Sequence, residues 1–161
     1  MSRPLAVQVE LRDMTGADLD AVVAIEDEAY SVPWSESTFR GLLRRRDAEM
    51  IVATAGEEVV GYAAFWCVID QGELGNVAVR STWRGFGLGA RLVTEVILRA
   101  ARRGVREVFL EVRPTNMVAR RLYEQFGFAI VGRRRNYYQQ PVEDALVLRR
   151  PVLLPTSQQE S

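Results

Sequence analysis

The fold is decided by residues 74–112, which read LGNVAVRSTWRGFGLGARLVTEVILRAARRGVREVFLEV. Residues 74–79 and 105–112 are rich in apolar and β-branched side chains, as strands are. Between them, apolar side chains recur at helical spacing from Leu88 to Ala100, and Gly104 is the residue type that ends helices. Strand, helix and strand in this order predict a βαβ unit, with two parallel strands joined by a right-handed crossover.

Upstream of this unit the sequence predicts an antiparallel meander. Three apolar runs, separated by gaps short enough for hairpin turns, lie at 50–55, 59–69 and 74–79, and the gaps are Gly56-Glu57 and Asp70-Gln71-Gly72. The run 59–69 is nearly all apolar, so we expect that strand to be covered on both faces. Cys67 lies within it and is expected to be a packed, unreactive thiol.

The flanking segments add helices and shorter strands. Thr15 and Asp18 have the spacing of a capping box before an amphipathic helix at 19–29. Pro33-Trp34-Ser35 interrupts that pattern, and Ser35 can cap a second short helix. The remaining expected elements are a strand at 7–11, a helix at 116–126 stopped by Gly127, and strands at 128–131 and 145–148.

Together these elements predict a mixed α/β (α+β) fold. Its central mixed sheet combines an antiparallel N-terminal meander with one parallel βαβ pair, and helices flank it. There is no internal repeat and no stretch rich in Pro, Gly or Ser that would divide the chain. We therefore expect a single domain over residues 1–150 and a flexible tail over 151–161.

The composition excludes several classes of protein. Of the 161 residues, 48% are hydrophobic, which is enough for one core without disulfides or metals. The 21 basic residues balance the 21 acidic ones, so no net field attracts nucleic acid or a membrane. The arginine runs at 44–46 and 133–135 are interpreted as solvated faces. We expect no direct nucleic-acid partner and no membrane partner.

The chain has one cysteine, Cys67, and no histidine. A lone thiol excludes an intramolecular disulfide framework and favours a reducing compartment. Without histidine there is no Ser–His or Cys–His nucleophile pair and no zinc ligand set. No apolar run has the length of a membrane span, and residues 1–7 lack the pattern of a signal peptide. The sequence predicts a cytoplasmic protein without a metal.

The turn Arg84-Gly85-Phe86-Gly87-Leu88-Gly89 lies between a strand and a helix. Glycines let the backbone approach a ligand, and the first amides of a helix attract anions, so the turn can bind a phosphate group. It can equally be a glycine-rich turn that only lets the helix pack closely on the strand. A dinucleotide fingerprint is also satisfied loosely, but the single βαβ unit after a meander argues against a doubly wound nicotinamide domain.

The glycine turn and several other segments resemble those of a known family. The turn at 84–89, following Asn76-Val77-Ala78-Val79, resembles the acetyl-CoA signature of the GNAT acetyltransferase superfamily. Further segments look like the RimI-type ribosomal-protein-alanine N-acetyltransferases: Pro33-Trp34-Ser35-Glu36 with Thr38-Phe39, Leu110-Glu111-Val112-Arg113 with Asn116, Leu122-Tyr123-Glu124 with Gly127-Phe128, and Arg135-Asn136-Tyr137-Tyr138. The resemblance runs from about Leu11 to Leu148. It departs at Arg84, where the family commonly has Gln.

The resemblance implies a GNAT-like acyl-CoA N-acyltransferase fold, acetyl-CoA as donor, and a role for particular residues. The backbone of Val77, Ala78 and Val79 should bind the pantetheine arm. The pyrophosphate should be held by Arg84, Gly85, Phe86, Gly87, Leu88, Gly89 and Ala90, with Asn116 near the thioester. Glu111 matches the family's proton acceptor and Tyr123 its proton donor. The acceptor peptide should be bordered by Tyr30, Trp34, Tyr137 and Tyr138, and Glu26 and Asp144 are candidates to meet a basic second residue.

Acid–base chemistry is compatible with these roles. With pKa values near 7.8 for an α-amine and 10.4 for lysine, the neutral α-amine is roughly a few hundred times more abundant at neutral pH. A modest base such as Glu111 therefore suffices, although Glu111 could instead be paired with Arg113 or another surface arginine, and Glu73 competes as base. Full proton transfer from Tyr123 to a thiolate is uphill by about 2 kcal/mol in water, so a hydrogen bond is the better role.

These considerations predict a protein N-terminal acetyltransferase that acts on the N-terminal alanine of a small-subunit ribosomal protein, by direct transfer in a ternary complex. One alternative is a GNAT enzyme that acetylates lysine side chains or small amines. The other is a non-catalytic acetyl-CoA-binding module, which would need the glycine turn but neither Glu111 nor Tyr123.

Overall fold

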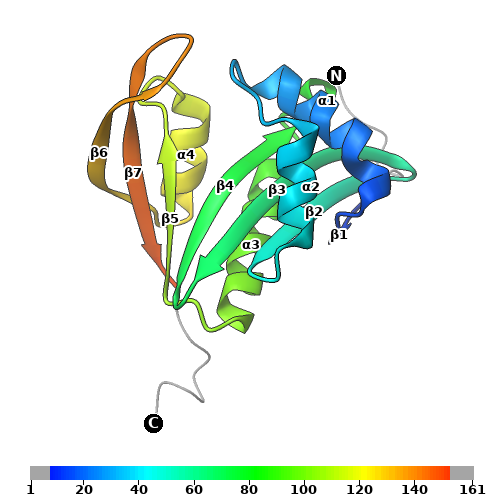
Figure 1. Ribbon diagram of the computed structural model, residues 1–161, viewed down its shortest axis with the longest axis horizontal. Coiled ribbons are helices and arrows are strands. Elements are labelled where there is room, and N and C mark those ends of the chain that lie inside the picture. Colours follow the sequence, from blue (N-terminus) through cyan, green and yellow to red (C-terminus); the bar gives the residue numbers. More distant parts are fainter. Residues whose placement is uncertain (1–7, 153–161) are drawn as a thin grey trace. The chain divides into compact units, whose positions relative to one another are not determined.

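The computed structural model describes residues 8–152 (Figure 1). Its strands are β1 (Val9–Asp13), β2 (Ala48–Ala55), β3 (Glu58–Val68), β4 (Gln71–Val79), β5 (Glu107–Val112), β6 (Ala129–Tyr138) and β7 (Glu143–Pro151). Its helices are η1 (Gly16–Asp18), α1 (Leu19–Ala29), α2 (Glu36–Arg44), η2 (Ser81–Trp83), α3 (Leu88–Arg102) and α4 (Met117–Gln125). Residues 1–7, which include the first residue of the expected strand at 7–11, lie outside the described residues, as do residues 153–161 of the tail expected over 151–161.

The strands form one mixed sheet in the order β1-β2-β3-β4-β5-β7-β6. β4 and β5 pair in parallel, with Gln71 opposite Glu107 and Glu73 opposite Phe109, and α3 connects the two strands. β5 pairs with β7, and β7 with β6, in antiparallel fashion. The predicted mixed α/β fold with one parallel βαβ pair is therefore confirmed.

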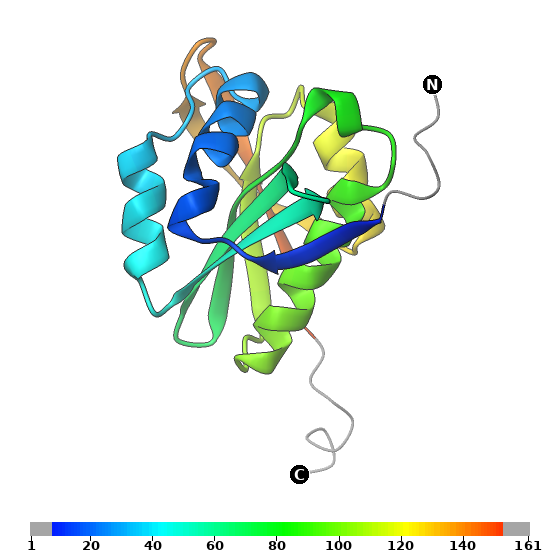
Figure 2. The ribbon, with the colours of Figure 1, turned by 90° about the vertical axis from the view of Figure 1, so that its right-hand side faces the viewer.

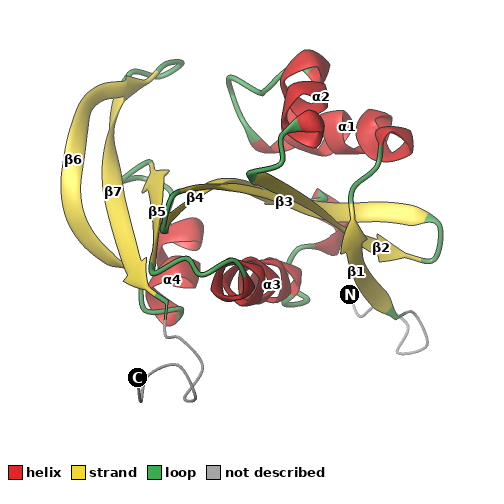
Figure 3. Ribbon diagram, turned by 60° about the horizontal axis from the view of Figure 1, so that its bottom comes forward, coloured by secondary structure: helices red, strands yellow, loops and turns green. Residues whose placement is uncertain are grey.

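The described residues fall into two compact units, of which the first comprises residues 8–64 and 76–93. Here α1 packs beside α2, and α2 packs on β2 (Figure 2). These two helices lie on one face of the strands, and the start of α3 lies on the other (Figure 3). A Cβ added at Gly61 would lie 3.1 Å from the Ala78 carbonyl oxygen and 3.3 Å from Leu92 Cδ1, so glycine permits the close approach of β3, β4 and α3.

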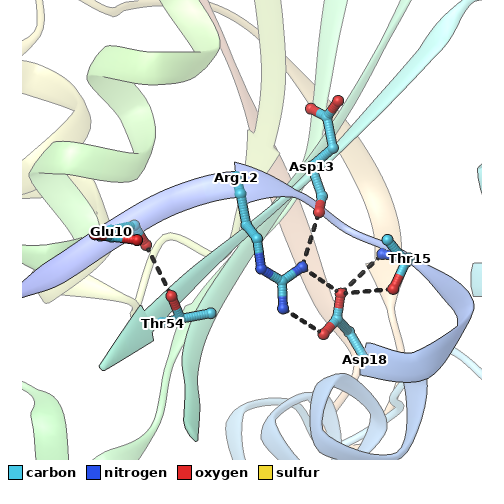
Figure 4. Close-up of polar contacts among 6 residues, drawn as sticks. All are labelled: Glu10, Arg12, Asp13, Thr15, Asp18 and Thr54. Atoms are coloured by element: carbon cyan, nitrogen blue, oxygen red, sulfur yellow. Dashed lines mark hydrogen bonds and ion pairs between the residues drawn. The ribbon is translucent and has the colours of Figure 1, made fainter. Parts of the chain in front are cut away.

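Both predicted helix starts in this unit are confirmed. The Ser35 hydroxyl accepts a hydrogen bond from the Thr38 N–H at 3.2 Å. The Asp18 carboxylate accepts one from the Thr15 N–H at 2.8 Å and also binds both terminal nitrogens of Arg12 (Figure 4). The hydrogen bonds from Arg12 are the main reason that the pKa of Asp18 is lowered, so this pair secures the connection from β1 into α1.

The second unit comprises residues 65–75 and 94–152. It contains β5, the β6–β7 hairpin, α4 and the C-terminal part of α3. Its core includes Val96, Val105, Val108, Leu110, Ala145 and Leu148, all nearly inaccessible to solvent. Inward-facing residues alternate along β5, so Glu111 lies on the face opposite Leu110 and Val112.

Four expectations were wrong in detail. β6 continues to Tyr138, well beyond the expected end at Val131, and β4 already begins at Gln71, which shortens the preceding turn. β3 is buried from Val59 to Phe65 but not beyond: Ile69, which follows the strand, is 94% exposed. Cys67 is half-buried rather than packed in the core.

Within residues 8–152, no helix has the length and apolar character needed to cross a membrane. The same residues contain no group of three or more Cys, Asp or Glu side chains arranged to hold a metal ion.

Candidate active site

The glycine turn lies in the first unit, between η2 and α3. Gly85 and Gly87 have φ values of 85° and 79°, in the left-handed region that side chains with a Cβ rarely adopt. A Cβ added at either residue would meet no heavy atom within 4 Å. Close packing of helix on strand therefore does not explain these two glycines, because the space around them is open. Their backbone conformation explains them, and it leaves the turn accessible to a ligand.

The start of α3 gives this turn its electrostatic character. The Arg91 N–H donates to the Gly87 carbonyl at 3.1 Å, which makes Gly87 the residue where the helical hydrogen bonds begin. The amides of the first turn have no acceptor inside an α-helix, and the helix dipole adds partial positive charge there. Leu88 is buried, whereas Phe86 is 41% exposed and packs edge-on against Trp83. The turn can thus present N–H groups to an anion.

The expected pantetheine-binding strand already accepts hydrogen bonds from two side chains. The Tyr30 hydroxyl donates to the Val77 carbonyl at 3.0 Å. The Arg84 Nε donates to the Val79 carbonyl at 3.3 Å, which holds this exposed guanidinium close to the end of β4. Ala78 is buried. Each carbonyl has a second lone pair, so neither contact prevents the strand from binding a further donor.

The segment between α1 and α2, residues 30–35, contains the expected acceptor-binding residues Tyr30 and Trp34. The Trp34 N–H donates to Glu26 Oε2 at 2.8 Å, and the Trp34 ring packs edge-on against Phe39. Glu26 was a candidate to meet a basic second residue of the acceptor, but it is 0% exposed and so does not present its carboxylate to an acceptor. Its place in α1 explains this, because Leu19, Val22 and Glu26 recur at helical spacing on the buried face.

The two candidate bases lie on neighbouring strands of the second unit. Glu111 is half-buried, and burial raises the pKa of its carboxyl, as does the charge of Glu73. Arg134, whose Nε lies 3.3 Å from Glu111 Oε1, opposes the rise. Glu73 is exposed in β4. The expected alternative partner, Arg113, binds Glu143 instead, at 3.3 Å.

Tyr123 and Asn116 are both held by α4. The Tyr123 side chain is 8% exposed and packs edge-on against Phe128, and this burial raises the pKa of its phenol to about 12. Asn116 is the N-cap of α4, since its side-chain oxygen accepts from the Ala119 N–H at 3.2 Å. The Asn116 amide nitrogen is not used in this cap and can donate to another group.

Tyr137 and Tyr138 end β6, where the register with β7 is irregular, and their rings pack edge-on with centroids 4.9 Å apart. The Arg113 guanidinium lies 4.4 Å from the Tyr138 ring centroid. Asp144, a candidate for a basic acceptor residue, accepts from the Asn136 N–H and pairs with Arg133. Its carboxylate is therefore engaged within the hairpin.

Sequence reasoning missed Arg134, which pairs with Glu111 and lies 5.9 Å from the Tyr137 ring centroid. The run 133–135 was interpreted as a solvated face. The alternation of side chains along a strand at this position could have shown that the three arginines do not share one face. Arg133 and Arg135 lie on one face of an extended strand, whereas Arg134 lies on the other.

The fold and the glycine turn at residues 84–89 are those of an N-acetyltransferase, an enzyme that acetylates amines. Residues 19–128 match the acetyltransferase (GNAT) family, and the chain belongs to that family. The [ribosomal protein bS18]-alanine N-acetyltransferase of Salmonella typhimurium is 37% identical over 141 residues, which cover 86% of this chain and 95% of that protein. The protein of the same name from Escherichia coli strain K12 is 36% identical over 137 residues, covering 84% and 92%.

The fold comparison agrees. The crystal structure of the ribosomal-protein-S18-alanine N-acetyltransferase from Escherichia coli matches with a TM-score of 0.84 and 32% identity, covering 92% of this chain and 96% of that one. The predicted GNAT-like fold and the resemblance to this kind of N-acetyltransferase are confirmed.

Proposed function

We propose that this enzyme transfers the acetyl group of acetyl-CoA to the α-amino group of the N-terminal alanine of a small-subunit ribosomal protein. The observation that carries the proposal is the identity of 36–37% to two bS18-alanine N-acetyltransferases over nearly the full length of each. A ribosomal acceptor implies a cytoplasmic reaction, with a protein N-terminus rather than nucleic acid or membrane as the direct partner.

Acetyl-CoA supplies the acetyl group as an activated thioester. The residues expected to hold it fit the group, since Gly85 and Gly87 form an open turn and the first amides of α3 attract phosphate oxygens. Arg84 adds a cation close to that turn. We assign the pyrophosphate to residues 84–90, the pantetheine arm to the backbone of residues 77–79, and the thioester end to Asn116.

We assign the role of general base to Glu111. The acceptor amine must lose a proton to attack, and a carboxylate whose pKa is raised toward neutrality accepts that proton more readily than an ordinary one. Burial supplies this rise at Glu111, and Arg134 limits it. Because the chain lacks histidine, we infer direct transfer between the two substrates rather than an acetyl-enzyme.

We assign Tyr123 as a hydrogen-bond donor to the leaving thiolate. Its pKa of about 12 exceeds the ordinary thiol value near 8.5 by about 3.5 units, so complete proton transfer would be uphill by about 5 kcal/mol. A hydrogen bond that strengthens as charge develops on sulfur avoids this cost. Contacts to the acceptor peptide are assigned to Tyr30 and Trp34 in the first unit, and to Tyr137 and Tyr138 in the second.

The test is mass spectrometry of peptides incubated with acetyl-CoA. The peptides carry Ala, Ser or Met first, an internal lysine, and either a free or a blocked N-terminus. We expect acetylation at the free N-terminus, fastest with alanine, and none on blocked peptides. Acetylation confined to lysine would contradict the proposal. Glu111→Gln and Tyr123→Phe should slow turnover, and an unchanged rate in Glu111→Gln with a loss in Glu73→Gln would transfer the base to Glu73.

A further inference from the structure

Glu26 is a carboxyl group buried in the first unit, away from solvent and at the C-terminal end of the apolar face of α1. A buried carboxylate is tolerated when hydrogen-bond donors surround it. Three donors do so here: the Tyr62 hydroxyl from β3 on Oε1, the Trp34 N–H on Oε2 at 2.8 Å, and the Asn76 amide, which lies 3.1 and 3.0 Å from the two oxygens. The carboxylate therefore joins three different elements.

Two of those elements carry residues assigned above to the substrates. Trp34 lies in residues 30–35, which we call the acceptor loop, and Asn76 directly precedes the 77–79 segment of β4. A second contact joins the same two elements, because the Tyr30 hydroxyl donates to the Val77 carbonyl. The acceptor loop is thus hydrogen-bonded to β4 near both of its ends. At Tyr30 the contact is direct, and at Trp34 it runs through the carboxylate of Glu26.

We propose that Glu26 is a positioning residue for acceptor binding: its carboxylate fixes the backbone of the acceptor loop at Trp34 against β4 at Asn76, so that the loop holds one conformation for the acceptor peptide. This inference rests on the proposed function. Glu26 does not reach the substrates itself, since it has no exposed surface.

The protonation state of Glu26 should control this attachment. An ionised carboxylate accepts from all three donors, whereas a protonated one carries an O–H that must itself donate and so displaces at least one of them. The groups facing Glu26 are Tyr62, Asn76 and the Trp34 N–H, and Asp27 is the neighbouring charge on α1. No cationic side chain within residues 8–152 forms an ion pair with it. Burial raises the pKa of Glu26 to about 7, so the attachment should weaken as the pH falls below neutrality.

The experiment measures binding of the acetylated product peptide to the full-length enzyme with CoA, by calorimetry between pH 6 and pH 8.5. A product peptide has no amine to titrate and no reaction to undergo. If the enzyme binds the peptide only when Glu26 is ionised, the competent fraction is about 0.97 at pH 8.5 and about 0.09 at pH 6. The wild type should therefore bind about tenfold more weakly at pH 6 than at pH 8.5. Glu26→Gln should bind more weakly at pH 8.5 and lose this difference. Glu26→Asp keeps a carboxylate and should restore part of it, and Asp20→Asn, which changes an exposed acidic residue of the same helix, should behave as the wild type.

A second measurement follows the loop without any substrate. Tryptophan emission of the free enzyme should change near pH 7 in the wild type, less in Trp34→Phe, and not in Glu26→Gln. Peptide affinity and pH response equal to the wild type in Glu26→Gln would overturn the inference, whatever the emission shows. An equal loss of CoA affinity and thermal stability would do the same, because it would mean a general folding role. If instead the wild type acetylates no α-amine, the proposed function fails, although the emission change would still appear.

Discussion

The strongest prediction for stability concerns Glu26→Gln and its effect on the pH dependence of unfolding. The Glu26 carboxyl has a pKa of about 7 in the folded protein, chiefly because it is buried, against 4.5 when exposed. Such a difference of about 2.5 units corresponds to about 3 kcal/mol of free energy between the two protonation states. The folded protein must supply this free energy whenever Glu26 is ionised.

The sign follows from proton binding. Between pH 4.5 and pH 7 the folded state holds a proton on Glu26 that the unfolded state has released, so the free energy of unfolding falls as the pH rises. The contribution of Glu26 is fully present below pH 4.5 and is lost by the time the pH passes 7. In the middle of that window the slope from this residue alone is about −1 kcal/mol per pH unit.

The assay is urea unfolding at pH 5, 6, 7 and 8, with the wild type and Glu26→Gln compared at each pH. Glutamine cannot ionise, so the variant should gain about 2.5 kcal/mol relative to the wild type between pH 5 and pH 8, whatever the absolute effect of the substitution. Asp20→Asn, at an exposed position of α1, controls for general charge effects. Parallel stability curves for the wild type and Glu26→Gln would refute the reasoning, since they would mean that Glu26 titrates alike in both states.

Three further predictions concern the candidate site. Arg134→Gln removes the cation 3.3 Å from Glu111. Because this pair is partly exposed, we expect its interaction free energy to be about 1 kcal/mol, so its loss should shift the acidic limb of the kcat/KM profile to higher pH by roughly 0.7 pH unit. Gly87→Ala forces a Cβ into a left-handed conformation, which should cost about 1 kcal/mol in urea unfolding and weaken acetyl-CoA binding in calorimetry, whereas Gly16→Ala, with open space and no positive φ, should do neither. Tyr123→Phe should lower kcat by roughly 10- to 100-fold in steady-state assays while the melting temperature stays nearly unchanged, because the ring packing on Phe128 remains.

The sequence predicted those parts of the fold in which burial produces a periodic pattern. The βαβ unit is an example: β5 alternates buried and half-buried residues, and α3 carries an apolar stripe. The extension of β6 to Tyr138 could not be read in this way. β6 is an edge strand that is exposed almost throughout, so no apolar alternation marks it, and its register with β7 shifts before Tyr138.

For the candidate site, local sequence predicted conformation better than partners. Gly85 and Gly87 were recognised because positive φ favours one residue type, and Ser35 because an N-cap needs only its own helix. The partners of charged groups depend instead on contacts between distant segments. Arg134 and its partner Glu111 are 23 residues apart in the sequence, and Glu26 and Asn76 are 50 residues apart. A local pattern of residues does not predict such contacts.

The environments of Glu111 and Glu73 give the remaining argument for which carboxylate is the base. Both lie on the same face of adjoining parallel strands, because Phe109, two residues before Glu111, is opposite Glu73. Glu73 is exposed, whereas Glu111 is half-buried, beside an arginine and with a raised pKa. Since two like charges on one face resist simultaneous ionisation, the negative charge of Glu73 strengthens the proton affinity of Glu111. Removing Glu73 should therefore lower the pKa of Glu111 and leave the catalytic group in place, whereas removing Glu111 takes away the proton acceptor itself.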